Sequence, residues 1–241
     1  GPTGSGKTNT LYSAIGRINT TEVNIMTVED PIEFNIPGIN QVQVNENIGL
    51  SFASVLKSFL RQDPNVILVG EIRDSETAEI AIKASLTGHL VFSTLHTNDA
   101  PSAVSRLVDM NIDPYLVATS VLLIVAQRLV RRLCIHCKEE TDVSHHALMN
   151  IGFTSEEANT VNVYKPKGCE KCSNTGYKGR IGLFEVMPVT EAIRNLIFAG
   201  ANVSEIRKKA VEEGMVTLRQ SGLIKIKHGA TTIEEVVRET F

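Results

Sequence analysis

Apolar and polar positions along the first 110 residues follow two alternating periods. Between Phe52 and Leu60 the apolar residues recur at helical spacing, and this amphipathic segment ends before Pro64. Val66–Val69 is instead an unbroken apolar run, which is typical of a parallel strand buried on both faces. The same criteria predict strands over Glu22–Val28, Gln41–Val44 and Leu90–Leu95, and helices over Thr8–Arg17, Ser75–Thr87 and Ala100–Asp109. Strands that alternate with helices predict a doubly wound α/β domain.

The second half of the chain has longer and less regular segments. Its longest apolar stretch, Tyr115–Ala126, is too short to span a bilayer and continues into charged residues. We therefore predict one core helix over Pro114–Leu133. A strand is expected over Arg180–Val189 and helices from Thr190 onward. The sequence Thr-Ile-Glu-Glu at Thr232–Glu235 is typical of a capping box at the start of the last helix.

The composition of the chain says more about its possible binding partners than about its fold. The 241 residues have a formal net charge of −3, whereas nucleic-acid binders are usually basic. Aromatic residues make up 5% of the chain and tryptophan is absent, which disfavours a surface for stacking bases. We expect no nucleic-acid partner, and we expect contact with a membrane only through partner proteins.

The first eight residues match the phosphate-binding loop pattern G-x-x-x-x-G-K-[ST] at every position. They are Gly1, Pro2, Thr3, Gly4, Ser5, Gly6, Lys7 and Thr8. Glycines let successive backbone N–H groups converge on phosphate oxygens at a helix N-terminus. Lys7 can reach the β- and γ-phosphates and the Thr8 hydroxyl can ligate Mg²⁺, so the loop predicts binding and hydrolysis of a nucleoside triphosphate. Because a buried strand normally precedes such a loop, we expect the chain to be a fragment whose N-terminal domains are missing.

Polar side chains follow three of the expected strands. They are Glu29 and Glu33 after the first, Glu71 after Val66–Val69, and His96 after Leu90–Leu95. In open α/β sheets ligands bind beyond the carboxyl ends of the strands, so we expect these groups to meet the phosphate loop at one site. Gly70 occupies the usual Walker B aspartate position, which leaves Glu71 to orient water or to hold Mg²⁺ through water. His96 can donate a hydrogen bond to the γ-phosphate.

Simpler explanations stay open for these polar residues. Glu71 could be a solvated carboxylate at a strand end, although catalysis is favoured. A histidine that stands alone, such as His89 or His96, is by default an ordinary hydrogen-bonded side chain.

All four cysteines lie in two C-x-x-C pairs, Cys134/Cys137 and Cys169/Cys172. Disulfides are rare in a reducing cytosol, and four thiolates in two close pairs match a tetrahedral structural Zn²⁺ site. The 31 residues between the pairs exceed the commonest zinc-ribbon spacing, so we expect them to form an excursion of their own. The alternative, that these are unligated or redox cysteines, is disfavoured because all four are paired.

Four blocks of the chain together resemble the secretion ATPase superfamily. They are GPTGSGKT (1–8), TVEDPIE (27–33), LRQDPNVILVGEIRD (60–74) and GHLVFSTLHTND (88–99), which correspond to that family's Walker A, Asp box, Walker B and His box. The four-cysteine segment followed by GYKGRIGLFEVM (176–187) resembles the zinc-bearing branch, which comprises type IV pilus assembly ATPases and type II secretion ATPases. The resemblance covers essentially the whole chain, in order.

This resemblance implies a fold and an activity. The fold is a RecA-like P-loop ATPase core over residues 1–133, a zinc-binding segment over 134–180 and a mostly helical C-terminal subdomain over 181–241. The activity is that of a homo-hexameric motor which hydrolyses ATP with Mg²⁺. The motor would be cytoplasmic and peripheral at the inner membrane, where it would act on a platform protein.

The resemblance also implies roles for single residues. Lys7 and Thr8 would bind phosphate and Mg²⁺, and the preceding residues of the loop would cradle the phosphates. Glu29 and Glu33 would face the metal and the γ-phosphate, with Glu71 as the catalytic glutamate. His96 would contact the γ-phosphate, with His89 in support, and Arg180 is a candidate for a polar contact near the nucleotide or a neighbouring subunit.

Several functions stay open at this point. Pilus assembly is preferred, and type II secretion is the alternative. A nucleotide-gated binding module would bind ATP through the same loop and would not need Glu71. A zinc-bearing nucleic-acid translocase would need a basic surface, which the net charge argues against.

Overall fold

The computed structural model describes residues 1–240, which divide into two compact units. Unit 1 comprises residues 1–124 and 187–213, and unit 2 comprises residues 125–186 and those from 214 onward. This division differs from the predicted boundaries after residues 133 and 180. Helices of the 187–213 segment pack on helices near residues 100–120, so the segment belongs with the first unit.

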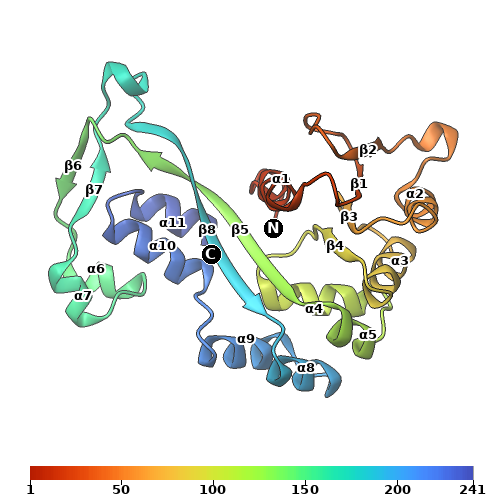
Figure 1. The fold of residues 1–241 in the computed structure, drawn as a ribbon. Coiled ribbons are helices and arrows are strands. Elements are labelled where there is room, and N and C mark those ends of the chain that lie inside the picture. Colours follow the sequence, from red (N-terminus) through yellow and green to blue (C-terminus); the bar gives the residue numbers. More distant parts are fainter. Residues whose placement is uncertain (241) are drawn as a thin grey trace. The chain divides into compact units, whose positions relative to one another are not determined.

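Unit 1 contains a four-stranded parallel sheet with the strand order β2–β1–β3–β4 (Figure 1). The strands are β1 (Ile25–Glu29), β2 (Asn40–Gln43), β3 (Val66–Val69) and β4 (Leu90–Ser93). Every residue of the central strands β1 and β3 is buried, as their apolar runs predict for strands covered on both faces. The α/β fold with a parallel sheet is therefore confirmed.

The helices of unit 1 pack on this sheet or on one another. They are α1 (Lys7–Ile18), α2 (Phe52–Phe59), α3 (Ser75–Leu86), α4 (Ala100–Asp109), α5 (Pro114–Ser120), α8 (Glu191–Phe198) and α9 (Val203–Glu212). Helix α1 buries Tyr12 and Ile15 against Ile25 of β1 and Leu68 of β3. Helices α2 and α3 pack against β1 and β4, while α8 packs on α5 and α9 on α4.

The predicted helix over Pro114–Leu133 is wrong beyond residue 120. Leu123–Leu133 forms strand β5, which pairs with β8 (Tyr177–Pro188) in a two-stranded sheet, and the two strands run in opposite directions in Figure 1. Leucine, alanine, glutamine and arginine favour a helix in isolation. Pairing with a strand more than 40 positions away overrides that local preference.

The rest of unit 2 is built from short elements. They are β6 (Lys138–Thr141), α6 (His145–Asn150), α7 (Ser155–Thr160), β7 (Val163–Pro166), α10 (Leu218–Lys227) and α11 (Ile233–Thr240), with 3₁₀ turns at Glu170–Cys172 in this unit and at Glu46–Ile48 in unit 1. Strands β6 and β7 pair antiparallel, so the residues between the cysteine pairs form their own excursion, as predicted. Side chains from α6, β7, α10 and α11 share one core, with Phe153, Val163 and Val236 among its buried members. Over residues 1–240, no helix has the length and apolarity to cross a bilayer.

Candidate nucleotide site and metal centre

The phosphate-binding loop leads directly into α1. Gly4 and Gly6 have φ values of 79° and 88°, a left-handed backbone that glycine adopts without strain. Lys7, in the first turn of α1, donates from Nζ to the carbonyl oxygens of Gly1 at 2.6 Å and of Pro2 at 3.0 Å. The Ser5 hydroxyl is buried without a hydrogen-bond partner among residues 1–240. A curled loop with a lysine over it and an orphaned donor inside it fits a phosphate group.

The loop lies beside the carboxyl end of β4. The nitrogen of Gly1 donates to the carbonyl oxygen of Leu95 at 3.1 Å, and the next residue is His96. The ring atom Nε2 of His96 is 3.0 Å from Oε2 of Glu71. The structure therefore brings together the loop, His96 and Glu71, which the sequence placed at one site.

Glu71 is held on both carboxylate oxygens. Besides the His96 contact, Oε1 accepts a hydrogen bond of 2.5 Å from Nη2 of Arg73, whose Nη1 is 3.4 Å from Asp30. Burial by itself raises the pKa of Glu71, but the hydrogen bond and charge of Arg73, together with His96, outweigh it and lower that pKa below its usual range. Glu71 is thus kept ionised, as a group that orients water requires.

Gly70 allows the strand ends to come this close. A Cβ atom at Gly70 would lie 3.3 Å from both the Cα of Glu29 and the carbonyl oxygen of Val28. The Gly70 nitrogen donates to that Val28 oxygen at 2.8 Å, and Thr94 donates from Oγ1 to the Gly70 oxygen at 2.8 Å. A side chain at position 70 would require these backbone atoms to shift by a few tenths of an ångström, so the close approach favours glycine there.

The two acids of the Asp box occupy different surroundings. Glu29 is 2% exposed at the end of β1, and its carboxylate accepts hydrogen bonds from Tyr12, Thr27 and Gln41. Glu33 is exposed on the following loop. The expectation that Glu33 faces a metal stays a prediction, whereas the carboxylate of Glu29 is engaged in hydrogen bonds inside the protein.

Two further candidates lie apart from this cluster. His89 precedes β4, at its amino end, where its Nδ1 contacts the Ala84 carbonyl at 2.9 Å and the Thr87 hydroxyl at 3.1 Å. The structure does not bring it to Glu71 and His96. Arg180 is an exposed residue of β8 in unit 2, and its assignment stays a prediction.

Several residues with contacts at the site were given no role from the sequence, and three of them show what the sequence could and could not indicate. They are Tyr12, Arg73 and Thr94. Arg73 had a signal, since a cation two positions after Glu71 at a strand end is placed to pair with it. Nothing in the sequence pointed to Tyr12, because its partner Glu29 lies 17 positions further along the chain.

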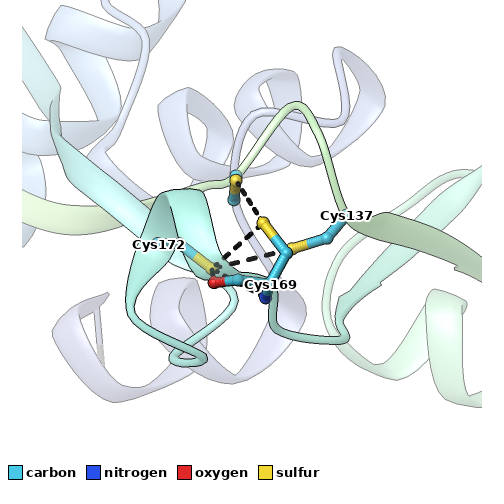
Figure 2. A group of neighbouring side chains, drawn as sticks. Cys137, Cys169 and Cys172 are labelled. Atoms are coloured by element: carbon cyan, nitrogen blue, oxygen red, sulfur yellow. Dashed lines mark hydrogen bonds between the residues drawn. The ribbon is translucent and has the colours of Figure 1, made fainter.

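The four cysteines of unit 2 converge on one point. Their Sγ atoms all lie within 4.8 Å of one another, with separations of 3.9 Å for Cys134–Cys169, 3.8 Å for Cys137–Cys172 and 3.7 Å for Cys169–Cys172 (Figure 2). A tetrahedron with zinc–sulfur bonds of about 2.3 Å has edges of roughly 3.8 Å. The four thiols are thus spaced to hold a metal ion.

The backbone around Cys172 favours its thiolate, whereas burial and the neighbouring thiols raise the pKa of Cys137 to about 12. Cys172 Sγ accepts from the N–H groups of Cys169 at 3.2 Å and Gly176 at 3.3 Å. Burial raises the pKa of Cys172, but these N–H groups outweigh it and lower that pKa to about 6. A thiolate is the form that binds a metal. The donor set and its surroundings therefore fit a metal centre made of sulfur alone.

Comparisons with known proteins agree with this geometry. A family model described as "Type II/IV secretion system protein" matches residues 1–238. The type IV pilus assembly ATPase PilB of Myxococcus xanthus is 54% identical over 241 residues, which are 100% of this chain and 43% of that protein. The type II secretion system protein E of Dickeya dadantii is 50% identical over 240 residues, which are 100% of this chain and 47% of that protein. The chain spans less than half the length of these two relatives.

Solved structures share the fold. The pilus retraction motor PilT with bound ADP superposes with a TM-score of 0.72 at 31% identity, and the match covers 99% of this chain and 59% of that one. The likeness extends over both the loop and the cysteine-bearing part of the chain, since almost all of its residues are matched.

Proposed function

Because the chain belongs to the type II/IV secretion system protein family, we propose that it carries the ATP-hydrolysing site of a motor that assembles type IV pili. The observation that supports the proposal most is one cluster at the carboxyl edge of the unit 1 sheet. There the phosphate-binding loop contacts Leu95, and the neighbouring His96 contacts Glu71. An ionised carboxylate beside a phosphate loop is the arrangement that phosphoryl transfer to water needs.

Each residue of the site has its own role in the proposed hydrolysis of ATP. Lys7 and the loop N–H groups would hold the phosphates, and Thr8 would hold Mg²⁺, which neutralises charge on the phosphates when bound. Glu71 would orient the attacking water, and Arg73 keeps Glu71 ionised. His96 would donate to the γ-phosphate, and Glu33 would face the metal side. Catalysis of this kind depends on position and charge rather than on covalent chemistry.

The motor that we propose is a homo-hexamer that works at the inner membrane on a platform protein. These features follow from the family resemblance and belong to the whole protein, of which this chain corresponds to less than half in its relatives. ATP hydrolysis at the loop and Glu71 would supply the energy that moves pilin subunits.

We further propose that the four cysteines hold structural Zn²⁺. Closed sites with four cysteines are typical of structural zinc, and the observed sulfur separations are near those of a zinc tetrahedron. A redox role needs only one pair of thiols, whereas all four sulfur atoms here lie within 4.8 Å of one another, as a closed four-cysteine metal site requires.

Type II secretion is the second candidate function. The relative from that system is 50% identical, close to the 54% of the pilus protein. Both functions use the same site, so the choice depends on the fibre that the motor drives.

The test is complementation with the full-length protein that contains this chain. Wild type and Glu71→Gln would be introduced into one strain without a pilus assembly ATPase and into another without a type II secretion ATPase. We expect wild type to restore pili and Glu71→Gln to restore none, while both bind ATP through the intact loop. Glu79→Gln is the matched control, because Glu79 is an exposed carboxylate on α3 that pairs with Lys83.

Each other outcome has a definite meaning. Restoration of secretion rather than pili would replace the proposed function by the second candidate. Restoration of pili by Glu71→Gln would contradict the hydrolytic role of this residue and favour a nucleotide-gated module.

A further inference from the structure

The buried carboxylate of Glu29 is the centre of a hydrogen-bond network beside the candidate nucleotide site. Its Oε2 accepts from the Tyr12 hydroxyl, and its Oε1 accepts from Thr27 Oγ1 at 2.5 Å and from Gln41 Nε2 at 3.2 Å. Glu29 is 2% exposed, Thr27 0% and Tyr12 5%. The three partners come from α1, β1 and β2, so one carboxylate ties three elements together.

Two of these partners also hold the loop that follows β1. The Tyr12 hydroxyl accepts from the Glu33 N–H at 3.3 Å, and its ring meets the Phe34 ring edge-on with centroids 4.7 Å apart. Gln41 donates from Nε2 to the Phe34 oxygen at 3.3 Å and accepts from the Ile36 N–H at 2.7 Å. Much of the loop is exposed, with Phe34 at 54%, so these contacts help to hold it, together with those of Asp30 to Arg73 and of the Ile32 N–H to Gln43.

Tyr12 stands one helical turn after Thr8 on α1. A shift of the loop that carries Lys7 and Thr8 therefore moves the Tyr12 hydroxyl, and the hydroxyl is bonded to the backbone of Glu33. We propose that Tyr12 is a positioning residue that couples the phosphate-binding helix to the Glu33 loop, and that Glu29 is its buried anchor rather than a metal-facing acid. The proposal rests on the ATPase site proposed above.

The protonation of Tyr12 suits this role. Burial, together with the hydrogen bond and charge of Glu29, raises the pKa of Tyr12 to about 12. The phenol therefore keeps its proton at physiological pH, and it can donate to Glu29 while it accepts from Glu33.

The first test is Tyr12→Phe in the full-length protein, which removes the hydroxyl and keeps the ring against Phe34. Misplacing a catalytic group by about 1 Å costs up to about 100-fold in rate, so we expect kcat for ATP to fall by about tenfold or more. KM and the affinity for ADP should stay within about twofold, because Lys7 and Thr8 are unchanged. Equal losses in kcat and nucleotide affinity would overturn the positioning role.

The matched control is Tyr115→Phe. Tyr115 is a tyrosine of unit 1 that is 61% exposed and contacts Phe198 through its ring alone. It should leave kcat and KM unchanged. Glu29→Gln tests the anchor, since a buried anchor leaves the Mg²⁺ dependence of the rate unaltered and a metal-facing acid shifts it.

A double-mutant cycle separates coupling from general damage. If Tyr12 acts through the loop that bears Glu33, Tyr12→Phe should lower kcat by no more than about twofold in a Glu33→Gln background. The same fold-loss in both backgrounds would show that Tyr12 acts elsewhere.

Amide hydrogen exchange provides a readout that does not need hydrolysis. In Tyr12→Phe we expect exchange over residues 30–36 to speed up by about tenfold, with α1 unchanged. If wild type binds ATP without hydrolysing it, the proposed function fails while this readout still supports or overturns the coupling. Unchanged exchange over 30–36 would overturn it.

Discussion

Glu71 lies between two groups that can carry positive charge, Arg73 and His96. Both of its oxygens are engaged, and the resulting balance lowers the pKa of Glu71 although burial alone would raise it. Arg73 also approaches Asp30 at 3.4 Å, so it links the end of β3 to the loop after β1. Arg73 therefore does more than any other neighbouring residue to keep Glu71 ionised.

Replacing that neighbour should change how activity depends on pH. In Arg73→Ala the pKa of Glu71 rises, because its main stabilising charge is gone while its burial remains. The acidic limb of the pH profile of kcat/KM should move to higher pH, and the rate near neutral pH should change less than the rate near pH 5. The measurement is the rate of ATP hydrolysis by the full-length protein across that range.

Arg61→Ala is the control for this prediction. Arg61 is an exposed arginine beyond α2 that donates to the Ser58 hydroxyl at 3.5 Å. Its acidic limb should coincide with that of wild type. An unmoved limb in Arg73→Ala, or a limb moved to lower pH, would contradict the assignment.

Much of the site could be predicted from single residues and their motifs. The phosphate loop, Glu71 and His96 are adjacent in the structure because parallel strands end at one edge, and that rule applies to sequence directly. The surroundings of Glu29 could not be predicted, because they depend on Tyr12 and Gln41, which fold onto it from other elements. His89 was assigned by motif alone, and it lies at the opposite end of its strand.

Helix α11 is joined to β5 by a buried carboxylate. Glu235 is 1% exposed and accepts three hydrogen bonds from Arg131, namely from its backbone N at 2.8 Å, Nε at 3.0 Å and Nη2 at 2.7 Å. Arg238 adds a contact at 2.7 Å, and the Arg131 guanidinium lies 4.1 Å from the centre of the Tyr177 ring. These contacts join α11 to β5, the strand that was expected to be helical.

Removing the charge of Glu235 should destabilise unit 2. In Glu235→Gln we expect the free energy of unfolding to fall by about 1–3 kcal/mol, because the half-exposed guanidinium groups of Arg131 and Arg238 lose a buried charged acceptor. The lower end is favoured, since the Arg131 side chain is 50% exposed and can be rehydrated. Urea unfolding monitored by circular dichroism measures the change.

The pH dependence of this effect has a definite sign. Burial raises the pKa of Glu235, but the hydrogen bonds of Arg131 outweigh it, so the folded-state pKa lies below the unfolded value. The contribution is full above pH of about 5 and is lost as pH falls through the folded-state pKa. The gap between wild type and Glu235→Gln should therefore close in acid, whereas Glu234→Gln, on the exposed side of α11, should show no gap at any pH. A gap that widens in acid would refute this account.

Elements with a strong local signal were predicted well, and the strand expected over Arg180–Val189 is confirmed as β8 (Tyr177–Pro188), whereas β5 was not predicted. The residues of β3 coincide with their apolar run, and α2 begins and ends within one residue of its pattern. Strand β5 was missed because its residues favour a helix and its partner β8 is distant. The predicted capping box of α11 is half present. The Glu235 nitrogen contacts Thr232 Oγ1 at 3.4 Å, while the Glu235 carboxylate is used by Arg131 and Arg238.

On the scale of the whole molecule, the chain passes between the two units three times. The cysteine centre belongs to unit 2, where it joins the end of β5 to the start of β8. Sequence motifs follow the chain in order, so they predicted consecutive domains and could not predict that residues 187–213 return to unit 1. Packing of α8 on α5 and of α9 on α4 decides that return.

Loss of zinc should loosen unit 2 and leave unit 1 intact. Structural zinc contributes about 10–16 kcal/mol of apparent folding free energy in small peptides. Its removal should therefore destabilise the whole segment that contains the two cysteine pairs. With a chelator, or in Cys137→Ser, we expect amide exchange over residues 134–176 to rise by about tenfold or more, while exchange in β1 and β3 stays unchanged. Hydrogen exchange with mass spectrometry measures both regions at once.

His136→Ala is the matched control. His136 is exposed between Cys134 and Cys137, so its removal should leave one zinc ion per chain by elemental measurement. Protein purified without chelator that contains no zinc would contradict the assignment, as would a metal content lowered by His136→Ala.

We propose above that Glu71, beside the phosphate-binding loop, is the residue on which ATP hydrolysis depends. The most direct measurement is steady-state ATP hydrolysis by the full-length protein, with wild type, Glu71→Gln and Glu79→Gln assayed side by side and ATP binding measured in each. We expect hydrolysis by wild type and Glu79→Gln, a rate at least about 100-fold lower in Glu71→Gln, and equal ATP affinity in all three. Hydrolysis by Glu71→Gln at most of the wild-type rate would contradict it.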